Sequence, residues 1–204
     1  MSDSTTQQLI DIGRWIDGKG WCPATGGNFS LRRPQGALVT RSGCHKGRLS
    51  EDDFIQVDWH GRASDLKQKP SAETLVHLCL YQRDDSINAV LHTHSTTSTV
   101  LSRLTTSDWL RLSGFEMQKS LSGNLSHDAE ISIAIFDNTQ DMQSLAQTIT
   151  QRWQTSPLHW GLLVRGHGLY AWGNDLPQAQ QHLEGLEFLM SCALEMQRLK
   201  AIQQ

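Results

Sequence analysis

The chain has 204 residues, of which 38% are hydrophobic and 19% charged, and a net charge of -3. This length suits one domain with one sizeable core, and the composition is that of a folded protein rather than a disordered one. No basic stripe favours nucleic acid, no apolar run approaches the ~20 residues that cross a bilayer, and "MSDSTTQQLI" lacks the features of a secretory signal. We therefore expect a single domain over residues 1–204, located in the cytoplasm, with no nucleic-acid or membrane partner.

The first half of the chain predicts one helix, then short strands, then a second helix. Apolar residues from Leu9 to Ile16 recur at helical spacing, and the glycines at 18 and 20 end that helix. "GNFSLR" and "GALVT" predict two strands around the "RRPQG" turn, and "DFIQVDWHG" contains a third. Ser71 is the expected N-cap of a helix through "AETLVHLCLYQR".

The second half alternates between the two kinds of element. "INAVLHTHS" and "ISIAIF" predict strands, and "TTSTVLSRL" and "DMQSLAQTITQRW" predict helices. "GLLVRGHGLYAWG" indicates two strands pinched at "RGHG", and Asp175 and Pro177 open a long helix to about Lys200. Strict strand–helix alternation is absent, so we expect an α/β fold with a mixed, largely antiparallel sheet and helices on both faces.

Two histidines one residue apart, His92 and His94 in "VLHTHS", follow an apolar run. On a strand their side chains point to the same face, with Cα atoms roughly 6.5–7 Å apart. Two imidazoles at that spacing can converge on one metal ion. The pair alone is compatible with a metal site and equally with surface or hydrogen-bonded core histidines.

His167 is the best candidate for a third ligand. In "RGHGLYAW" it stands between two glycines directly after an apolar strand, where the backbone can approach a site closely. Three histidines with an open fourth position make a catalytic zinc site. The other histidines lack such a setting, and His77 and His182 are expected to be ordinary interface or surface residues. Cys22, Cys44, Cys79 and Cys192 are isolated, so neither disulfides nor a thiolate zinc site is indicated.

Three loops of small residues have the character of anion-binding sites. They are "PATGGNFSLR", "TRSGCHKG" and "KPSAE", and their candidate residues are Thr25, Gly27, Asn28, Ser42, Gly43, Lys46 and Ser71. Flexible backbone N–H groups, hydroxyls and a helix N-terminus all favour an anion. Each loop is also consistent with an ordinary turn; together, beside a metal pair, they favour a phosphorylated small substrate.

Two carboxylates, Glu73 and Glu116, are candidate acid/base groups. Glu73 lies at the start of a predicted helix, where a carboxylate is also favourable as a simple structural cap. Glu116, in "LSGFEMQKS", follows the histidine pair along the chain. By itself it is consistent with an ordinary surface residue.

The motifs "ATGGNFSLR", "SGCHKG", "KPSAE", "VLHTHS" and "RGHGLYAWG", in this order over nearly the whole chain, resemble the zinc-dependent class II aldolase family. The resemblance implies a three-layer α/β/α sandwich, and a homotetramer with active sites near the subunit interfaces. It implies one Zn²⁺ per subunit on His92, His94 and His167, and substrate phosphate held by the small-residue loops. "GFEMQKSL" and "SGCHKGRLSEDDF" are most similar to the dehydratases of this family.

The resemblance also implies a reaction: loss of water from 5-methylthioribulose 1-phosphate in methionine salvage, giving 2,3-diketo-5-methylthiopentyl 1-phosphate. Glu73 matches the acid/base carboxylate of the aldolases, and Glu116 matches the glutamate proposed as acid/base in the dehydratases. Because the chain carries both, which of them removes the C3 proton stays open. Two alternatives remain: a class II sugar-phosphate aldolase or epimerase, and a non-catalytic interaction module like the adducin head.

Overall fold

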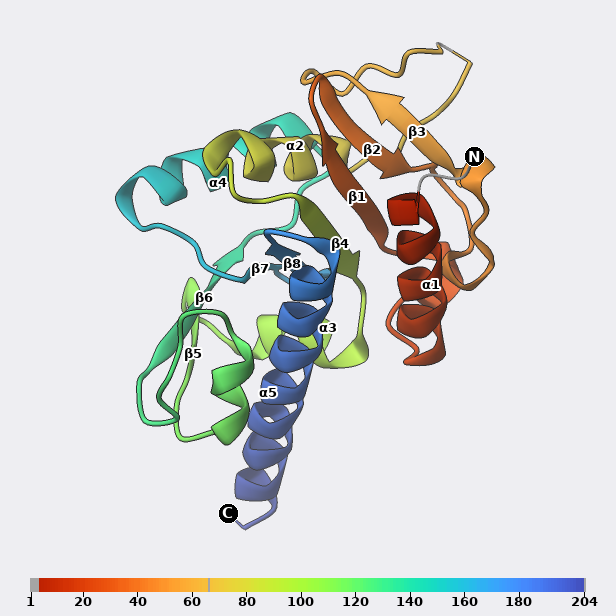
Figure 1. Ribbon diagram of the computed structural model, residues 1–204. Helices are drawn as coiled ribbons and strands as arrows, with labels where there is room; N and C mark the ends of the chain where they lie inside the picture. Colours follow the sequence, from red (N-terminus) through yellow and green to blue (C-terminus); the bar gives the residue numbers. More distant parts are fainter. Residues whose placement is uncertain (1–3, 66, 204) are drawn as a thin grey trace.

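The strands form one mixed sheet in the computed structural model, which describes residues 4–65 and 67–203 (Figure 1). Across the sheet the order is β3 (Phe54–Val57), β2 (Gly36–Thr40), β1 (Asn28–Arg33), β4 (Ala89–Thr93), β8 (Gly168–Gly173), β7 (Gly161–Val164), β6 (Ile131–Phe136) and β5 (Trp109–Leu112). Within the described residues β6 and β7 run parallel, and every other neighbouring pair is antiparallel. This confirms the predicted mixed, largely antiparallel sheet.

Helices cover both faces of the sheet. The helices α2 (Thr74–Arg83) and α4 (Met142–Thr155) pack on one face, and α1 (Ser4–Gly18), α3 (Thr96–Leu104) and α5 (Leu176–Ile202) on the other. Side chains alternate between the two cores, so Val90 and Tyr170 face α2 and α4 while Leu91 and Leu169 face α5. The result is the expected three-layer α/β/α sandwich.

Short 3-10 helices connect several of these elements: η1 (Pro23–Thr25), η2 (Lys46–Arg48), η3 (Glu51–Asp53) and η4 (Glu116–Ser120). None of the helices in the described parts of the chain has the length and apolar character that a membrane span requires.

The expectation that Ser71 caps α2 is wrong. The helix begins at Thr74 with Glu73 in the N-cap position, and the side chain of Glu73 makes no capping hydrogen bond. Ser71 lies in the loop before the helix, where its backbone N–H donates to the carbonyl of Thr40 at 3.2 Å. Its hydroxyl accepts a hydrogen bond from the backbone N–H of Glu73 at 3.4 Å, within the turn that precedes the first helical residue.

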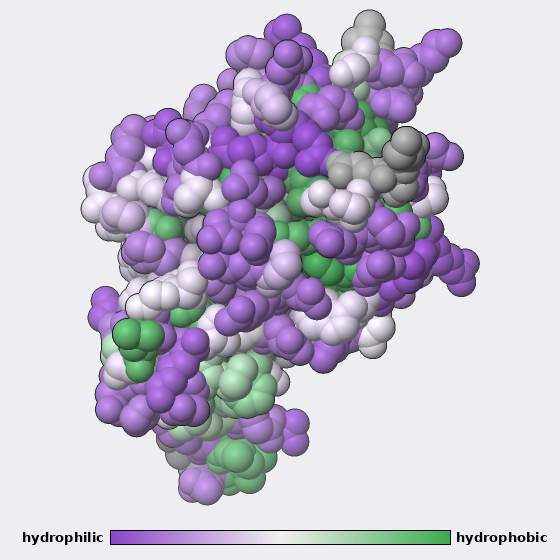
Figure 2. All heavy atoms as spheres, viewed as in Figure 1, coloured by the Kyte–Doolittle hydropathy of each residue, from purple (hydrophilic) through white to green (hydrophobic). Residues whose placement is uncertain are grey.

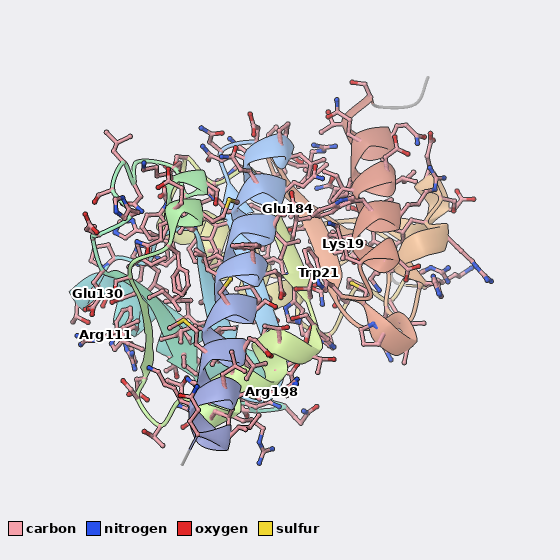
Figure 3. All side chains as sticks on the ribbon, turned by 90° about the horizontal axis from the view of Figure 1, so that it is seen from below. Lys19, Trp21, Arg111, Glu130, Glu184 and Arg198 are labelled. Atoms are coloured by element: carbon pink, nitrogen blue, oxygen red, sulfur yellow. The ribbon has the colours of Figure 1, made fainter. Side chains whose placement is uncertain are left out.

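The end of α1 is held next to α5 (Figure 3). Lys19 Nζ lies 3.4 Å from Glu184 Oε1 on α5 and 5.9 Å from the ring centroid of Trp21. An exposed ion pair of this kind stabilises a fold by less than about 1 kcal/mol. It lies beside the segment in which the carbonyl of Trp21 accepts a hydrogen bond from the backbone N–H of His94 at 2.8 Å.

Candidate metal centre

Three imidazoles and one carboxylate meet at the carboxyl end of β4. His94 Nε2 lies 2.8 Å from His92 Nε2 and 2.9 Å from His167 Nε2. Glu73 Oε1 lies 2.8 Å from His167 Nε2, and Glu73 Oε2 lies 3.5 Å from His92 Nε2. The four ligand atoms all lie within 4.8 Å of one another, which is close enough for one metal ion to bind them together.

The strands explain why these side chains converge. His92 lies near the end of β4 and His94 directly follows it, so strand alternation turns both rings to the same side. His167 lies in the turn between β7 and β8, where Gly166 has a φ of +67°. In the same turn, a Cβ on Gly168 would lie 1.9 Å from the carbonyl oxygen of Thr93. Glycine therefore lets the β7–β8 turn lie against the end of β4.

The protonation states of His92 and His94 suit a metal ion. The ring of His92 is fully buried, and its Nδ1 donates to the carbonyl of Leu169 at 2.9 Å, which leaves the Nε2 lone pair facing the cluster. Burial lowers the pKa of His92 well below its usual value and that of His94 to about 4. Neutral imidazoles are the form that binds a metal ion. Nitrogen lone pairs this close together repel unless a proton or cation lies between them, so the donor set fits a divalent metal.

Glu73 is held in the cluster by the chain around it. Burial by itself would raise its pKa, but the imidazoles of His92 and His167 and the side-chain amide of Asn28 hold the pKa of Glu73 below its usual value. Asn28 donates a hydrogen bond to Glu73 Oε2, and on β1 it pairs with His92 of β4. Glu73 is therefore an ionised carboxylate directly beside the imidazoles.

The "TGGN" segment packs against the histidines. A Cβ on Gly26 would lie 2.6 Å from Nδ1 of His94, and one on Gly27 would lie 2.5 Å from the carbonyl oxygen of His92. Thr25 and Gly27 have φ of +67° and +75°, and Thr25 is exposed. The two glycines are thus required by close approach to the cluster.

The other two small-residue loops lie against each other. The backbone N–H of Ser42 donates to the carbonyl of Lys69 at 3.0 Å, as that of Ser71 does to Thr40. Lys46 is almost fully buried, and its ammonium group donates to the carbonyls of Thr25 and Cys44, both at 2.8 Å. Lys46 therefore joins the "TGGN" loop to the "SGCHKG" loop. Gly43, with φ of +76°, has nothing within 4 Å of an added Cβ.

Glu116 lies outside this cluster in the single chain. It is on η4, its side chain is 73% exposed, and it pairs with Lys119 Nζ at 2.8 Å. That hydrogen bond and charge lower the pKa of Glu116. A general acid near neutrality needs a raised pKa, so Glu116 requires different surroundings to act as one.

Of the two settings expected for His77 and His182, interface or surface, the structure shows the first: both are buried between a helix and the sheet. His77 Nδ1 lies 2.6 Å from Ser30 Oγ, which in turn lies 2.7 Å from Tyr81 Oη. His182 Nδ1 donates to the carbonyl of Trp172 at 2.6 Å. Both ring nitrogens of His182 and Nδ1 of His77 thus have hydrogen-bond partners, whereas Nε2 of His77 is buried and has none among the described residues.

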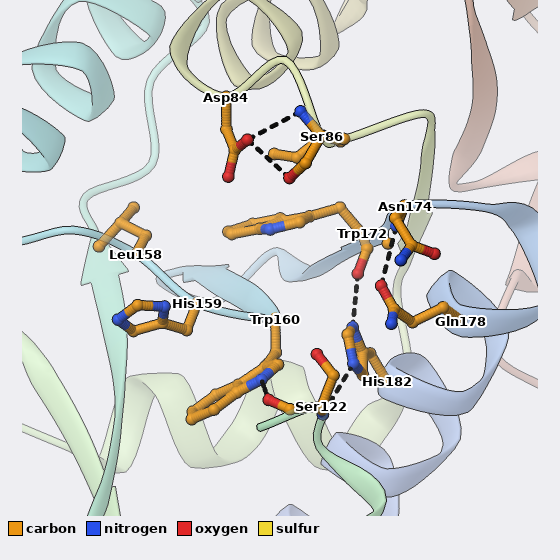
Figure 4. Close-up of a pocket in the computed structure, with 12 residues that line it drawn as sticks. Asp84, Ser86, Ser122, Leu158, His159, Trp160, Trp172, Asn174, Gln178 and His182 are labelled. Carbon is orange, nitrogen blue, oxygen red and sulfur yellow. Dashed lines mark hydrogen bonds between the residues drawn. The ribbon is translucent and has the colours of Figure 1, made fainter. Parts of the chain in front are cut away.

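A separate cavity of about 150 Å³ lies at the opposite end of the β4–β8 pair (Figure 4). Trp172 and Trp160 lie on two sides of it, with Asp84 and His159 at its margin. His182 accepts a hydrogen bond from the backbone N–H of Ser122 at 3.1 Å in its wall. None of the predicted site residues lines this cavity, so the candidate site is the histidine cluster.

An α/β/α sandwich with three histidines and a glutamate at the end of a central strand defines a class II aldolase-type domain. The profile of the class II aldolase and adducin N-terminal domain matches residues 7–194, and the chain belongs to this family.

Two curated relatives are methylthioribulose-1-phosphate dehydratases. That of Yersinia enterocolitica is 53% identical over 194 residues, covering 95% of this chain and 92% of the relative. That of Pseudoalteromonas translucida is 46% identical over 202 residues, covering 99% and 96%. Among solved structures, an L-fuculose-1-phosphate aldolase from Thermus thermophilus superposes with a TM-score of 0.79 at 24% identity, covering 98% of this chain and 99% of that one. At that identity the superposition shows the shared fold alone.

Proposed function

We propose that this chain dehydrates 5-methylthioribulose 1-phosphate to 2,3-diketo-5-methylthiopentyl 1-phosphate, a hydro-lyase reaction of methionine salvage in the cytoplasm. The observation that carries the proposal is the cluster of three imidazoles and an ionised carboxylate. The identity of about half over nearly the whole chain to the two dehydratases supports this reaction within the family.

We assign one Zn²⁺ per subunit to His92, His94 and His167. Their Nε2 atoms face one another, and imidazole nitrogens suit zinc better than they suit calcium or magnesium. When bound, such an ion supplies Lewis-acid chemistry, which polarises the substrate carbonyl and makes the neighbouring C3 proton removable.

We assign the removal of the C3 proton to Glu73, because its carboxylate lies directly beside the imidazoles that would hold the metal ion. Its ionised state makes it a base, and Asn28 fixes the direction in which Oε2 points. The side chain of Glu73 is only 14% exposed, which limits the access of bulk water to it. General base catalysis of this kind contributes about 10²–10⁴-fold in rate.

Loss of the C4 hydroxyl needs a proton, and we assign its donor to Glu116 of a neighbouring subunit in a homotetramer. Its exposure in the single chain leaves it available to a second copy. Exposed apolar side chains, including Met196, Leu199 and Ile202, gather at the free end of α5 (Figure 2), and such a surface favours association. Burial at an interface would raise the pKa of Glu116 as a general acid requires.

We assign the substrate phosphate to the three loops, through Thr25, Gly27, Asn28, Ser42, Gly43 and Ser71. Successive backbone N–H groups in turns with a left-handed residue can form a concave anion site, and Gly27 and Gly43 both have positive φ. Lys46 adds a positive charge next to these loops, and its hydrogen bonds to two loop carbonyls hold the ammonium group in place.

The test is a direct assay of the purified protein with methylthioribulose 1-phosphate, with and without a chelator. We expect turnover that the chelator abolishes and that added Zn²⁺ restores. Release of dihydroxyacetone phosphate from fuculose or rhamnulose 1-phosphate, without dehydration, would replace the proposal by a class II aldolase. Sub-stoichiometric metal after mild purification, with no turnover of either substrate, would favour an interaction module.

A further inference from the structure

A buried carboxylate lies behind the histidine cluster, on the opposite side of strand β4. Glu187 on α5 is only 3% exposed and lies within the apolar stripe of that helix, one turn from Leu183 and Met190. Its Oε2 accepts a hydrogen bond from Ser95 Oγ at 2.7 Å, and its Oε1 accepts one from Thr93 Oγ1 at 3.3 Å.

The two hydroxyls that bind Glu187 stand on either side of His94 in the sequence. Because side chains alternate along an extended segment, His92 and His94 face the metal centre while Thr93 and Ser95 face α5. One carboxylate therefore holds the back of the segment whose front carries two of the three histidines. Ser95 is also the N-cap of α3, accepting a hydrogen bond from the backbone N–H of Ser98 at 3.0 Å.

The ring of His94 has no comparable support of its own. Nδ1 of His92 donates to the carbonyl of Leu169, outside the cluster. Among the described residues, the hydrogen-bond contacts of the His94 ring are made by Nε2, which faces the cluster. The position of the His94 ring therefore depends on the backbone of residues 93–95. That backbone is fixed by Trp21 through the N–H of His94 and by Glu187 through the two hydroxyls.

Burying the carboxyl group of Glu187 is energetically unfavourable at a helix position where an apolar side chain would pack equally well. No Lys or Arg pairs with it in the described part of the chain, and burial raises its pKa to about 7. A leucine or methionine at this place in the stripe would avoid the cost of burying a carboxyl group. The hydrogen bonds of Glu187 to two hydroxyls on one short segment indicate a structural role for this carboxylate.

We propose that Glu187 is a positioning residue for the metal centre, which fixes residues 93–95 so that His94 keeps the geometry of a ligand. This inference rests on the proposed metal site and adds a residue to it. Groups behind the direct ligands typically change metal affinity by about 10–100-fold when removed.

The test measures binding of Co²⁺ to the metal-free full-length protein, by titration and by the visible absorption of the bound ion. Glu187→Leu keeps the size and burial and removes both acceptors. We expect it to weaken Co²⁺ binding about 10–100-fold and to change the absorption bands, which report the ligand geometry. Glu187→Gln keeps one acceptor oxygen and gains an N–H group that can donate to either hydroxyl. Its Co²⁺ affinity should therefore stay closer to that of the wild type.

Two further variants separate positioning from general destabilisation. Thr93→Val removes one of the two hydroxyls at constant shape, and it should weaken binding in the same direction, with little further loss when combined with Glu187→Leu. Glu184→Gln, one turn earlier on α5 and exposed (Figure 3), should bind Co²⁺ like the wild type. Should Glu187→Leu fail to fold, Thr93→Val carries the comparison.

Wild-type affinity and an unchanged spectrum in folded Glu187→Leu, or in Thr93→Val if the former does not fold, would overturn the inference and leave the metal site standing. An equal loss in Glu184→Gln would also overturn it. Failure of the wild type to bind Co²⁺ or Zn²⁺ would remove the proposed metal site itself, and the role of Glu187 with it.

Discussion

The imidazole of His92 lies face to face on the ring of Tyr170, with the centroids 3.7 Å apart and the planes 12° from parallel. The two residues are partners in the β4–β8 register, so the sheet itself sets the stack. The hydrogen bond from Nδ1 to Leu169 and the stack on Tyr170 together leave the ring one orientation. The hydroxyl of Tyr170 is buried and has no partner among the described residues.

Tyr170→Phe should therefore keep the metal centre and leave the stability unchanged or slightly higher. The stack needs only the ring, and removal of an unpaired buried hydroxyl relieves a desolvation cost of about 1–3 kcal/mol. Tyr170→Ala removes the ring itself and should cost about 3–5 kcal/mol, as large-to-small changes in a core do. Urea unfolding and zinc content of the three proteins check this. A loss of more than 1 kcal/mol in Tyr170→Phe would reveal a partner of the hydroxyl.

Gly26→Ala should weaken metal binding although the backbone there suits any residue. Gly26 has φ of -60° and ψ of 167°, so alanine meets no backbone strain. Its Cβ would, however, lie 2.6 Å from His94 Nδ1 and displace that ring. We expect at least a tenfold loss of zinc affinity, of the order seen when metal ligands are mispositioned. Gly18→Ala is the matched control, since nothing lies within 4 Å of its Cβ. Equal zinc affinity in both variants would contradict the contact.

The stability of the metal-free protein should fall with decreasing pH partly through His77. Burial lowers the pKa of His77 to about 4, against a value near 6.5 in the unfolded chain. Between these two values the unfolded state binds a proton that the folded state does not. Stability is therefore lost as the pH falls from about 6.5 to 4, by up to about 1.4 kcal/mol per pH unit.

His77→Gln should remove this one-proton slope while keeping a polar partner for Ser30. Urea unfolding of the chelated protein between pH 7.5 and 5 gives the slope for each variant. His60→Gln, in an exposed turn, should keep the slope of the wild type. Parallel curves for His77→Gln and the wild type would show that His77 is not the group responsible.

Much of the fold could be predicted because local patterns agree with the tertiary structure. Alternation in "GNFSLR" and "ISIAIF" is set by burial on both faces of the sheet, and such strands appear where the pattern places them. β5 was not predicted, since "WLRL" is four residues long and lies at the edge of the sheet. A short edge strand owes its form to its neighbour β6, which the local sequence does not show.

Only part of the candidate site could likewise be predicted from local sequence patterns. His92 and His94 share one strand end, so their convergence follows from spacing, whereas the approach of His167 and Glu73 depends on the order of strands in the sheet. Glu187 could have been found from the sequence, because a glutamate on the buried stripe of a helix is unusual. Tyr170 could not, since only the β4–β8 register places it on His92.

Glu116→Gln should abolish dehydration while the zinc content stays at one ion per subunit. The change removes the proton donor proposed for the C4 hydroxyl and touches none of the four clustered residues. A loss of about 10²–10⁴-fold in kcat is expected for a general acid. Glu130→Gln, another exposed glutamate in an ion pair (Figure 3), should keep wild-type turnover. Near-wild-type kcat in Glu116→Gln would falsify its role.

Mixing two inactive variants tests whether Glu116 acts across a subunit interface. Glu116→Gln keeps its histidines but lacks the acid, and His94→Ala keeps the acid but lacks a ligand. If each active site combines the histidines of one chain with Glu116 of its neighbour, subunit exchange creates some sites with both intact. We expect activity to appear when the two variants are unfolded and refolded together, and not when each is refolded alone. Refolded mixtures that contain both chains in one oligomer and stay inactive would mean that Glu116 serves its own chain or none.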